Sequence, residues 1–238
     1  LIWKVNVEGT LRLAQRMAQV EGLQRFLHVG TAMSCSPEPD SLVAESAEFR
    51  ERAEHLVEYT HSKSTIEQLM QQQCPTLPLV IARPSIVVGH THHGCRPSSS
   101  IFWVFSMGLM LQKFMCSMVD YCADALLMLL NQPLAHGEVV HISAGEENSV
   151  KFAEIDRAMA QALEQAPVGD KYAQVSYETL VKMRRELKGI FGPCNERLML
   201  KAMRLYGAFA TLNVRFSNDK LLSMGMPKPP RFTDYIDR

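Results

Sequence analysis

A tyrosine and a lysine four residues apart, Tyr59 and Lys63, form the pattern in this sequence with the clearest chemical use. On a helix the two side chains lie one turn apart, at about 5–6 Å. A neighbouring cation favours the phenolate and lowers the pKa of the phenol from about 10. We therefore expect the pair to donate and accept a proton near neutral pH. The alternative is structural, with Tyr59 in the core and Lys63 extending to the surface.

The pair falls on a segment, 47–73, that is expected to form one long helix. Its inward stripe consists of Leu56, Tyr59, Lys63, Ile66 and Met70. A lysine on such a stripe is unfavourable unless its charge is used. A second set at helical spacing is expected to form the solvated face: Glu45, Glu48, Glu51, Glu54 and Glu58.

Helical and strand-like segments alternate along the first part of the chain. Strands are expected at Phe26–Val29, Leu77–Ala82 and Val139–Ser143, and further helices at Leu1–Gln19 and Ala125–Asn131. This alternation is typical of an α/β fold with a parallel sheet, whose ligands bind beyond the carboxyl ends of the strands. Thr31 follows the first strand and Pro84 the second. We therefore expect both residues to meet the Tyr59 helix at one edge of the sheet.

Composition and charge exclude several classes. The chain has 238 residues, 47% of them hydrophobic, and a formal net charge of zero, so it lacks the electrostatic pattern of a nucleic-acid-binding protein. Six scattered cysteines without a C-x-x-C pair indicate reduced thiols and a cytoplasmic location. There is no signal peptide and no apolar run of membrane-spanning length. The spacing of His90, His92, His93 and Cys95 fits no usual zinc pattern, and we expect no metal site.

From Lys151 onward helical patterns dominate, so we expect a boundary near residue 150. Before it, the segment 98–115 reads as a helix that is apolar nearly all round. Such a helix is either packed on both sides or lines an apolar pocket.

Several segments, taken in order, resemble the extended short-chain dehydrogenase/reductase superfamily. They are Asn6–Thr10, Val29–Ala32, Tyr59–Lys63, Ala82–Gly89 and Val119–Asp124. The residues of these motifs are most similar to those of the branch that contains fatty acyl-CoA reductases and thioester reductase domains. The segment Pro229–Tyr235 also resembles that branch. The resemblance implies that residues 1–150 form the C-terminal half of a Rossmann-type dinucleotide-binding domain, and residues 151–238 a smaller, mostly helical substrate-binding lobe.

The resemblance also implies roles for individual residues. Tyr59 would be the general acid, Lys63 would hold the nicotinamide ribose and lower the Tyr59 pKa, and Thr31 would hydrogen-bond the substrate carbonyl. Asn6 would help to order the lysine. The backbone along the nicotinamide carboxamide would come from Pro84, Ser85 and Ile86. The expected cofactor is NADP(H) rather than NAD(H), although the residue that chooses between them lies outside the sequence.

Two departures from the family pattern stand out. No G-x-x-G-x-x-G turn occurs, and we expect the family's first hundred or so residues, its nucleotide-binding half, to be missing. The family also has a strand between Met115 and Val119, which Cys116-Ser117-Met118 is not expected to supply. We therefore expect residues to be missing between Cys116 and Val119.

The expected function is an NAD(P)H-dependent reductase of an acyl thioester or aldehyde with an apolar tail. Two alternatives keep the same residues: a nucleotide-sugar epimerase or dehydratase, and a hydroxysteroid dehydrogenase. A third is a non-catalytic nucleotide-binding scaffold, although such proteins commonly lose the tyrosine or lysine. Expected partners are small molecules and not nucleic acid, with membrane-surface contact through Phe102, Trp103 and Phe105 as a further idea.

Overall fold

The computed structural model divides the chain into two compact units. Unit 1 comprises residues 1–88, 115–149 and 214–231, and unit 2 comprises residues 89–114, 150–213 and 232–238. The structure describes residues 1–48, 54–87, 90–92, 113–114, 116–117, 119–162, 164, 166–167, 169, 176–182, 200, 204, 208–209 and 212–235.

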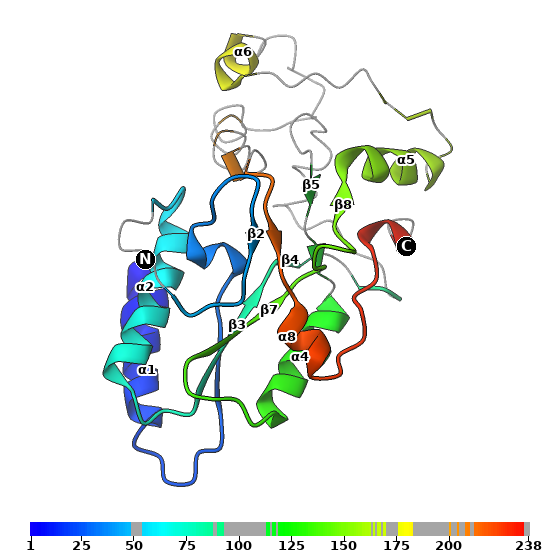
Figure 1. Cartoon of the computed structure of the whole chain (residues 1–238). Helices are drawn as coiled ribbons and strands as arrows, with labels where there is room; N and C mark the ends of the chain where they lie inside the picture. Colours follow the sequence, from blue (N-terminus) through cyan, green and yellow to red (C-terminus); the bar gives the residue numbers. More distant parts are fainter. Residues whose placement is uncertain are drawn as a thin grey trace. The chain divides into compact units, whose positions relative to one another are not determined.

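A parallel three-stranded sheet forms the centre of unit 1 (Figure 1). Its strands are β1 (Phe26–Val29), β3 (Leu79–Pro84) and β7 (Glu138–Ile142), in the order β1-β3-β7. Every residue of β3 is buried, as expected for a central strand covered on both faces. The α/β fold class and all three strands are confirmed, with shifts of one or two residues at their ends.

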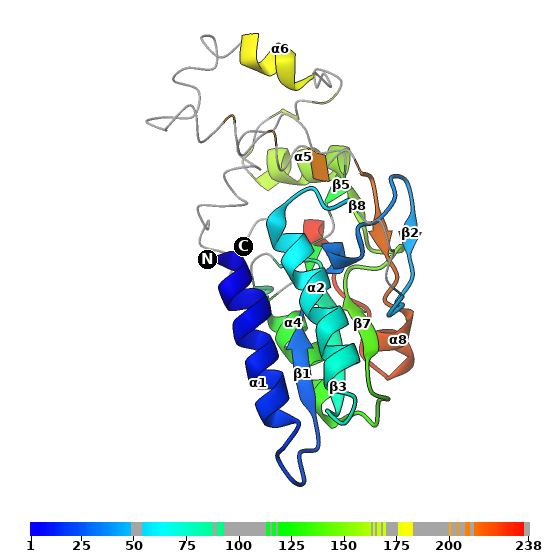
Figure 2. The same ribbon diagram turned by 90° about the vertical axis from the view of Figure 1, so that its left-hand side faces the viewer.

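Helices cover both faces of this sheet (Figures 1 and 2). On one face lie a continuous first helix, which is π-helical over η1 (Lys4–Gly9) and α-helical over α1 (Thr10–Met17), and α2 (Glu58–Gln73). On the other face lies α4 (Val119–Asn131). The buried core between the first helix, α2 and the sheet includes Val7, Ala14, Ile66, Met70, Leu79 and Ile81.

Shorter elements complete unit 1. A 3-10 turn, η2 (Ala32–Cys35), follows β1, and α8 (Asp219–Ser223) packs near β7. Two parallel pairs are β2 (Leu42–Val43) with β9 (Arg215–Phe216), and β4 (Ile86–Val87) with β6 (Cys116–Ser117). Residues 214–231 thus belong to unit 1, although they lie beyond residue 150.

Unit 2 contains β5 (Lys113–Phe114), which pairs antiparallel with β8 (Val150–Lys151). It also contains α5 (Phe152–Ala162), α6 (Tyr177–Lys182) and η5 (Phe232–Asp234). The expected apolar helix at 98–115 lies outside the described residues except at Lys113–Phe114, which form a strand. The assignment of residues 151–238 as a substrate-binding lobe stays a prediction.

Two expectations about local structure are wrong. The stretch before Val119 does supply a strand, because Cys116–Ser117 pairs with Ile86–Val87. The family's strand is thus present, so there is no longer a reason to expect missing residues between Cys116 and Val119. The second error concerns α2, which begins at Glu58 rather than near Ala47, because Val57 before it is extended.

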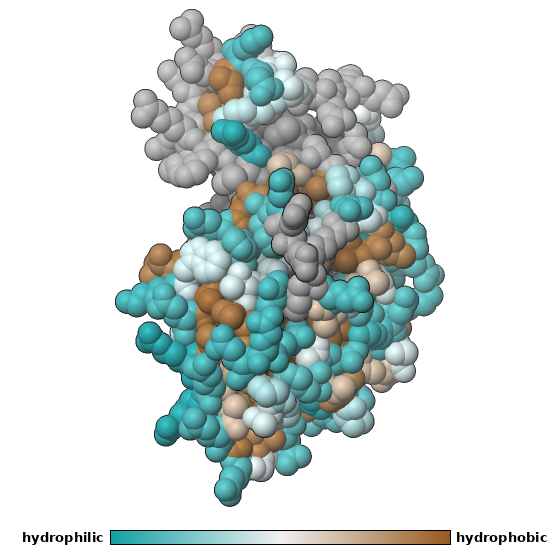
Figure 3. All heavy atoms as spheres, turned by 60° about the vertical axis from the view of Figure 1, so that its left-hand side comes forward, coloured by the Kyte–Doolittle hydropathy of each residue, from teal (hydrophilic) through white to brown (hydrophobic). Residues whose placement is uncertain are grey.

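The surface over the first helix and α2 is largely hydrophilic, with separate hydrophobic patches (Figure 3). Exposed apolar side chains on the first helix include Ile2, Val5 and Leu13. Among the described residues, no helix combines the length and the hydrophobicity needed to cross a membrane.

Candidate active site

Helix α2 carries both residues of the Tyr59–Lys63 pair, one turn apart, at its N-terminal end. Further along the helix, Ile66 and Met70 are fully buried against the sheet and hold α2 in place. Tyr59 is 44% exposed, and Lys63 is half-buried. The expected inward stripe is therefore confirmed at Ile66 and Met70 but is wrong for Leu56 and Tyr59, which are exposed. The phenol and the ammonium lie at a partly hydrated edge.

The ammonium of Lys63 reaches the end of strand β1. Its Nζ donates a hydrogen bond to the carbonyl oxygen of Val29, at 2.9 Å. Val29 is the last residue of β1, two residues before Thr31. Lys63 therefore lies at the carboxyl end of the strand, which is the edge where the parallel-sheet pattern places a ligand.

The electrostatics of the pair differ from the expectation. Partial burial raises the pKa of Tyr59, so the expected lowering of that pKa by Lys63 is wrong for this structure. Loss of hydration lowers the pKa of Lys63, and the nearby Glu67 carboxylate opposes this fall. A phenol already keeps its proton at neutral pH, and the raised pKa holds it more firmly. A protonated phenol can donate a proton to a substrate oxygen.

Thr31 is the N-cap of the turn η2. Its backbone is extended, and its Oγ1 accepts a hydrogen bond from the Met33 amide at 3.4 Å. A hydroxyl that accepts in this way still has its own hydrogen to donate. Thr31 can therefore both cap the turn and donate to a substrate carbonyl.

Asn6 contacts the turn of α2 that lies between Tyr59 and Lys63. Its Nδ2 donates to Ser62 Oγ at 3.0 Å, and Ser62 Oγ donates to the Tyr59 carbonyl oxygen at 2.8 Å. Asn6 lies within the π-helical turn η1, a conformation that recurs at functional sites. The bond from Asn6 fixes the first helix to the part of α2 that carries the phenol and the ammonium.

Pro84, Ser85 and Ile86 stand at the end of β3, beside the end of β1 in the sheet. The Ser85 amide donates a hydrogen bond to the Ile142 carbonyl oxygen at 2.9 Å, so this backbone donor is already paired within the protein. Ile86 opens β4 and is 37% exposed. Hydrogen bonds thus connect Asn6 to α2 and Lys63 to the end of β1. The segment 84–86 lies at the end of β3, the strand next to β1.

The sequence interpretation missed a buried ion pair close to these residues. Arg83 is 1% exposed and Glu67 is fully buried, with Arg83 Nη2 2.6 Å from Glu67 Oε2. A signal was available, because Glu67 continues the spacing of four from Tyr59 and Lys63. Glu45 was also missed: it was placed on a solvated face but is 9% exposed and accepts hydrogen bonds from the His141 and Lys220 amides.

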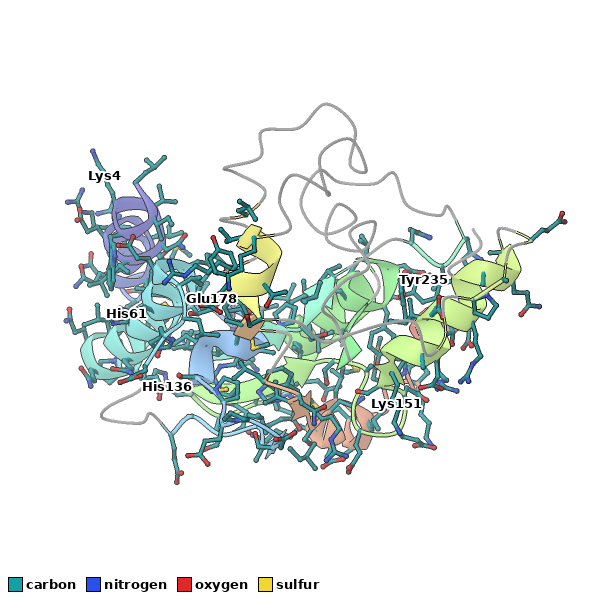
Figure 4. The ribbon with its side chains drawn as sticks, turned by 90° about the horizontal axis from the view of Figure 1, so that it is seen from above. Lys4, His61, His136, Lys151, Glu178 and Tyr235 are labelled. Atoms are coloured by element: carbon teal, nitrogen blue, oxygen red, sulfur yellow. The ribbon has the colours of Figure 1, made fainter. Side chains whose placement is uncertain are left out.

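His61, on the same helix, was expected to be a neighbour without assigned chemistry. Its ring stacks on His55 at 5.1 Å and meets Trp3 edge-on at 5.0 Å. Figure 4 shows His61 on α2 beside the first helix, on which Lys4 is labelled. These contacts give His61 a packing role between α2 and the start of the chain.

A family model described as "Male sterility protein", an NAD-binding domain, matches residues 2–128, which is more than half of the chain. The chain belongs to this family. The matched range includes the first helix, β1, α2, β3 and all of α4 except its last three residues. It therefore covers all of the residues predicted for the site.

The chain is also similar to a curated protein and to several solved structures. The chain is 23% identical over 210 residues to "Putative fatty acyl-CoA reductase CG8303" of Drosophila melanogaster, covering 69% of this chain and 38% of that protein. The terminal R domain from the myxalamid PKS-NRPS biosynthetic pathway matches with a TM-score of 0.74 at 16% identity, over 95% of this chain and 60% of that one. UDP-glucuronic acid 4-epimerase from Bacillus cereus, in complex with NAD, matches with a TM-score of 0.62 at 15% identity. This match covers 98% of this chain and 65% of the epimerase chain.

These structural matches show a Rossmann-type α/β fold. The chain spans well under half of the length of the curated relative and about three fifths of the R domain.

Proposed function

We propose that this protein acts as an NAD(P)H-dependent reductase of the extended short-chain dehydrogenase type, on an acyl thioester or aldehyde with an apolar tail. The observation that carries the proposal is the position of Lys63. Its ammonium donates a hydrogen bond to the end of β1, and it belongs to a residue one helical turn from Tyr59, whose pKa is raised by burial.

The residues present fit the nicotinamide end of such a cofactor. Lys63 would hold the ribose, since an ammonium at a half-buried position has donors for vicinal hydroxyls. Pro84, Ser85 and Ile86 would run along the carboxamide. A reduced nicotinamide would supply the hydride.

The remaining chemistry belongs to the protein. Charge develops on the substrate oxygen during reduction, and the Thr31 and Tyr59 hydroxyls are the donors proposed to stabilise it. Tyr59 then gives its proton to that oxygen, and the positive charge of Lys63 offsets the phenolate that remains.

The substrate class is supported by the relatives. One is named for fatty acyl-CoA reduction and another is a terminal R domain of a PKS-NRPS pathway. We include NADP(H) rather than NAD(H) in the proposal. The second candidate is a nucleotide-sugar epimerase, which the fold shared with UDP-glucuronic acid 4-epimerase favours.

The direct test is turnover by the full-length protein. It is incubated with NADPH or NADH and with a long-chain acyl-CoA, a long-chain aldehyde or a UDP-sugar, while cofactor absorbance and products are followed. We expect NADPH oxidation with the acyl-CoA or the aldehyde. Conversion of a UDP-sugar without net cofactor oxidation would support the epimerase, and no oxidation with any acyl compound would refute the reductase proposal.

A further inference from the structure

We propose that the buried pair Glu67–Arg83 is a positioning device that fixes Lys63 and the Thr31 turn relative to each other. The inference rests on the proposed function, because it concerns the same site. Neither residue belongs to the expected set of catalytic or cofactor-binding residues. Both are more completely buried than any member of that set except Pro84.

The Glu67 carboxylate contacts two of the segments that carry the site. Arg83, next to Pro84, donates to Glu67 Oε2 from Nε at 3.0 Å and from Nη2 at 2.6 Å. Ser34, three residues after Thr31 in the turn η2, donates its hydroxyl to the same carboxylate at 3.2 Å from Oε1. One side chain of α2 thus joins the end of β3 to the turn after β1.

A third contact comes from Gly30, the residue directly after β1. A Cβ placed on Gly30 would lie 2.2 Å from Glu67 Oε1, so the carboxylate packs directly on this residue. Gly30 follows Val29, whose carbonyl accepts the hydrogen bond from Lys63. Lys63 and Glu67, one turn apart on α2, therefore contact adjacent residues at the end of β1.

Charge links the two residues as well. The Glu67 carboxylate opposes the fall in the Lys63 pKa that burial causes. Burial raises the pKa of Glu67, but the guanidinium and the Ser34 hydroxyl favour its ionised form. The ionised carboxylate in turn favours the charged ammonium, which is the form that can donate to a ribose hydroxyl.

A purely structural role is the competing explanation. Buried ion pairs often add little net stability, and apolar replacement of both partners can be neutral or stabilising, whereas loss of one partner is strongly destabilising. Stability alone therefore cannot separate the two explanations. The charge state of Lys63 can separate the two explanations, because an ion pair with a purely structural role does not need to influence the charge of Lys63.

The experiment compares Glu67→Gln with a matched control, Glu45→Gln, in the full-length protein. Glu45 is also a buried carboxylate, but it bonds the His141 and Lys220 amides instead of the site. Lys63 is labelled with an amine-reactive reagent across a range of pH, and the labelled peptide is quantified by mass spectrometry. We expect the Lys63 pKa to fall in Glu67→Gln and to stay at the wild-type value in Glu45→Gln.

Kinetics provide the second measurement. In Glu67→Gln we expect kcat to fall on the order of 100-fold, since small displacements of a catalytic group carry costs of that size. The basic limb of the pH–rate profile should move to lower pH, following the Lys63 pKa. If Glu67→Gln does not fold, the double variant Glu67→Leu with Arg83→Met replaces it, and we expect a folded protein with the same changes.

The outcomes separate this inference from the proposed function. An unchanged Lys63 pKa in both Glu67 variants, or an equal change in Glu45→Gln, would overturn the positioning role even if the wild type is an active reductase. A wild type that oxidises no NADPH would overturn the proposed function. The labelling result would then still decide whether Glu67 controls Lys63.

Discussion

The Lys63 ammonium donates a hydrogen bond to the carbonyl oxygen of Val29, 2.9 Å away. This bond joins α2 to the last residue of β1 and brings the cation to the strand end that Thr31 follows. Apolar packing of Ile66 and Met70 fixes the rest of the helix. The position of the phenol thus depends on the hydrophobic core and on polar contacts at its edge, among them this bond and the bond from Asn6 to Ser62.

The Thr31 hydroxyl is expected to stabilise charge on the substrate oxygen. Thr31→Ala should lower kcat/KM for NADPH-dependent reduction by about 10²-fold, the usual cost of one lost donor at an oxyanion. Loss of the N-cap of η2 should also destabilise the fold by about 1 kcal/mol.

Thr31→Ser provides the control, because it keeps the hydroxyl and should retain most of the activity. Activity is measured as NADPH oxidation, and stability by urea unfolding. If the alanine and serine variants were equally active, the Thr31 hydroxyl would have no catalytic role.

Gly30→Ala should displace the Glu67 carboxylate. The backbone of Gly30 is outside the left-handed region, so the penalty arises from the 2.2 Å approach of the new Cβ to Glu67 Oε1 and not from backbone strain. Forced displacement in a packed core costs about 1–3 kcal/mol.

Shortening the acid should relieve this clash, so Gly30→Ala with Glu67→Asp should lose less stability than the two single changes added together. Urea unfolding of the four proteins gives the coupling free energy. Purely additive losses would show that Gly30 and Glu67 do not interact.

Acid should destabilise the fold through two buried histidines. Burial is the main cause that lowers the pKa of His28 to about 4 and that of His141 to about 3, and the charge of Arg83 lowers both further. The unfolded chain takes up protons below about pH 6.5 while the folded chain does not, so stability falls as pH decreases from 6.5 toward 4. His28 alone accounts for on the order of 3 kcal/mol over this range.

The measurement is the free energy of unfolding at neutral pH and at about pH 5. His28→Gln cannot titrate, so its stability should depend less on pH than that of the wild type. The comparison is needed because Glu45, whose pKa burial raises, acts in the opposite direction. Identical pH dependence in the two proteins would contradict the prediction.

Much of the fold could be predicted because it follows from local patterns. The short apolar runs at Phe26–Val29 and Val139–Ser143 predict buried strands, and the stripe through Ile66 and Met70 predicts a helix face toward the core. Tyr59 and Lys63 share one helical turn, so their proximity follows from spacing alone.

The remaining features depend on tertiary contacts. Glu67 and Glu45 look like surface glutamates until Arg83 and the amides of His141 and Lys220 come to them from distant parts of the chain. The direction of the Tyr59 pKa was also missed, because it depends on how far the phenol is buried. The strand at Cys116–Ser117 is two residues long and depends entirely on its partner, Ile86–Val87.

The most direct test of the central claim is the rate of NADPH oxidation by Tyr59→Phe, with Tyr121→Phe as the matched control. Tyr59 is 44% exposed, so its variant should fold normally, whereas Tyr121 is 6% exposed and donates its hydroxyl to the Pro227 carbonyl oxygen. We predict that Tyr59→Phe loses about 10²–10⁴-fold in kcat, as expected for a general acid, and that Tyr121→Phe loses only stability. Wild-type turnover by Tyr59→Phe would contradict the account.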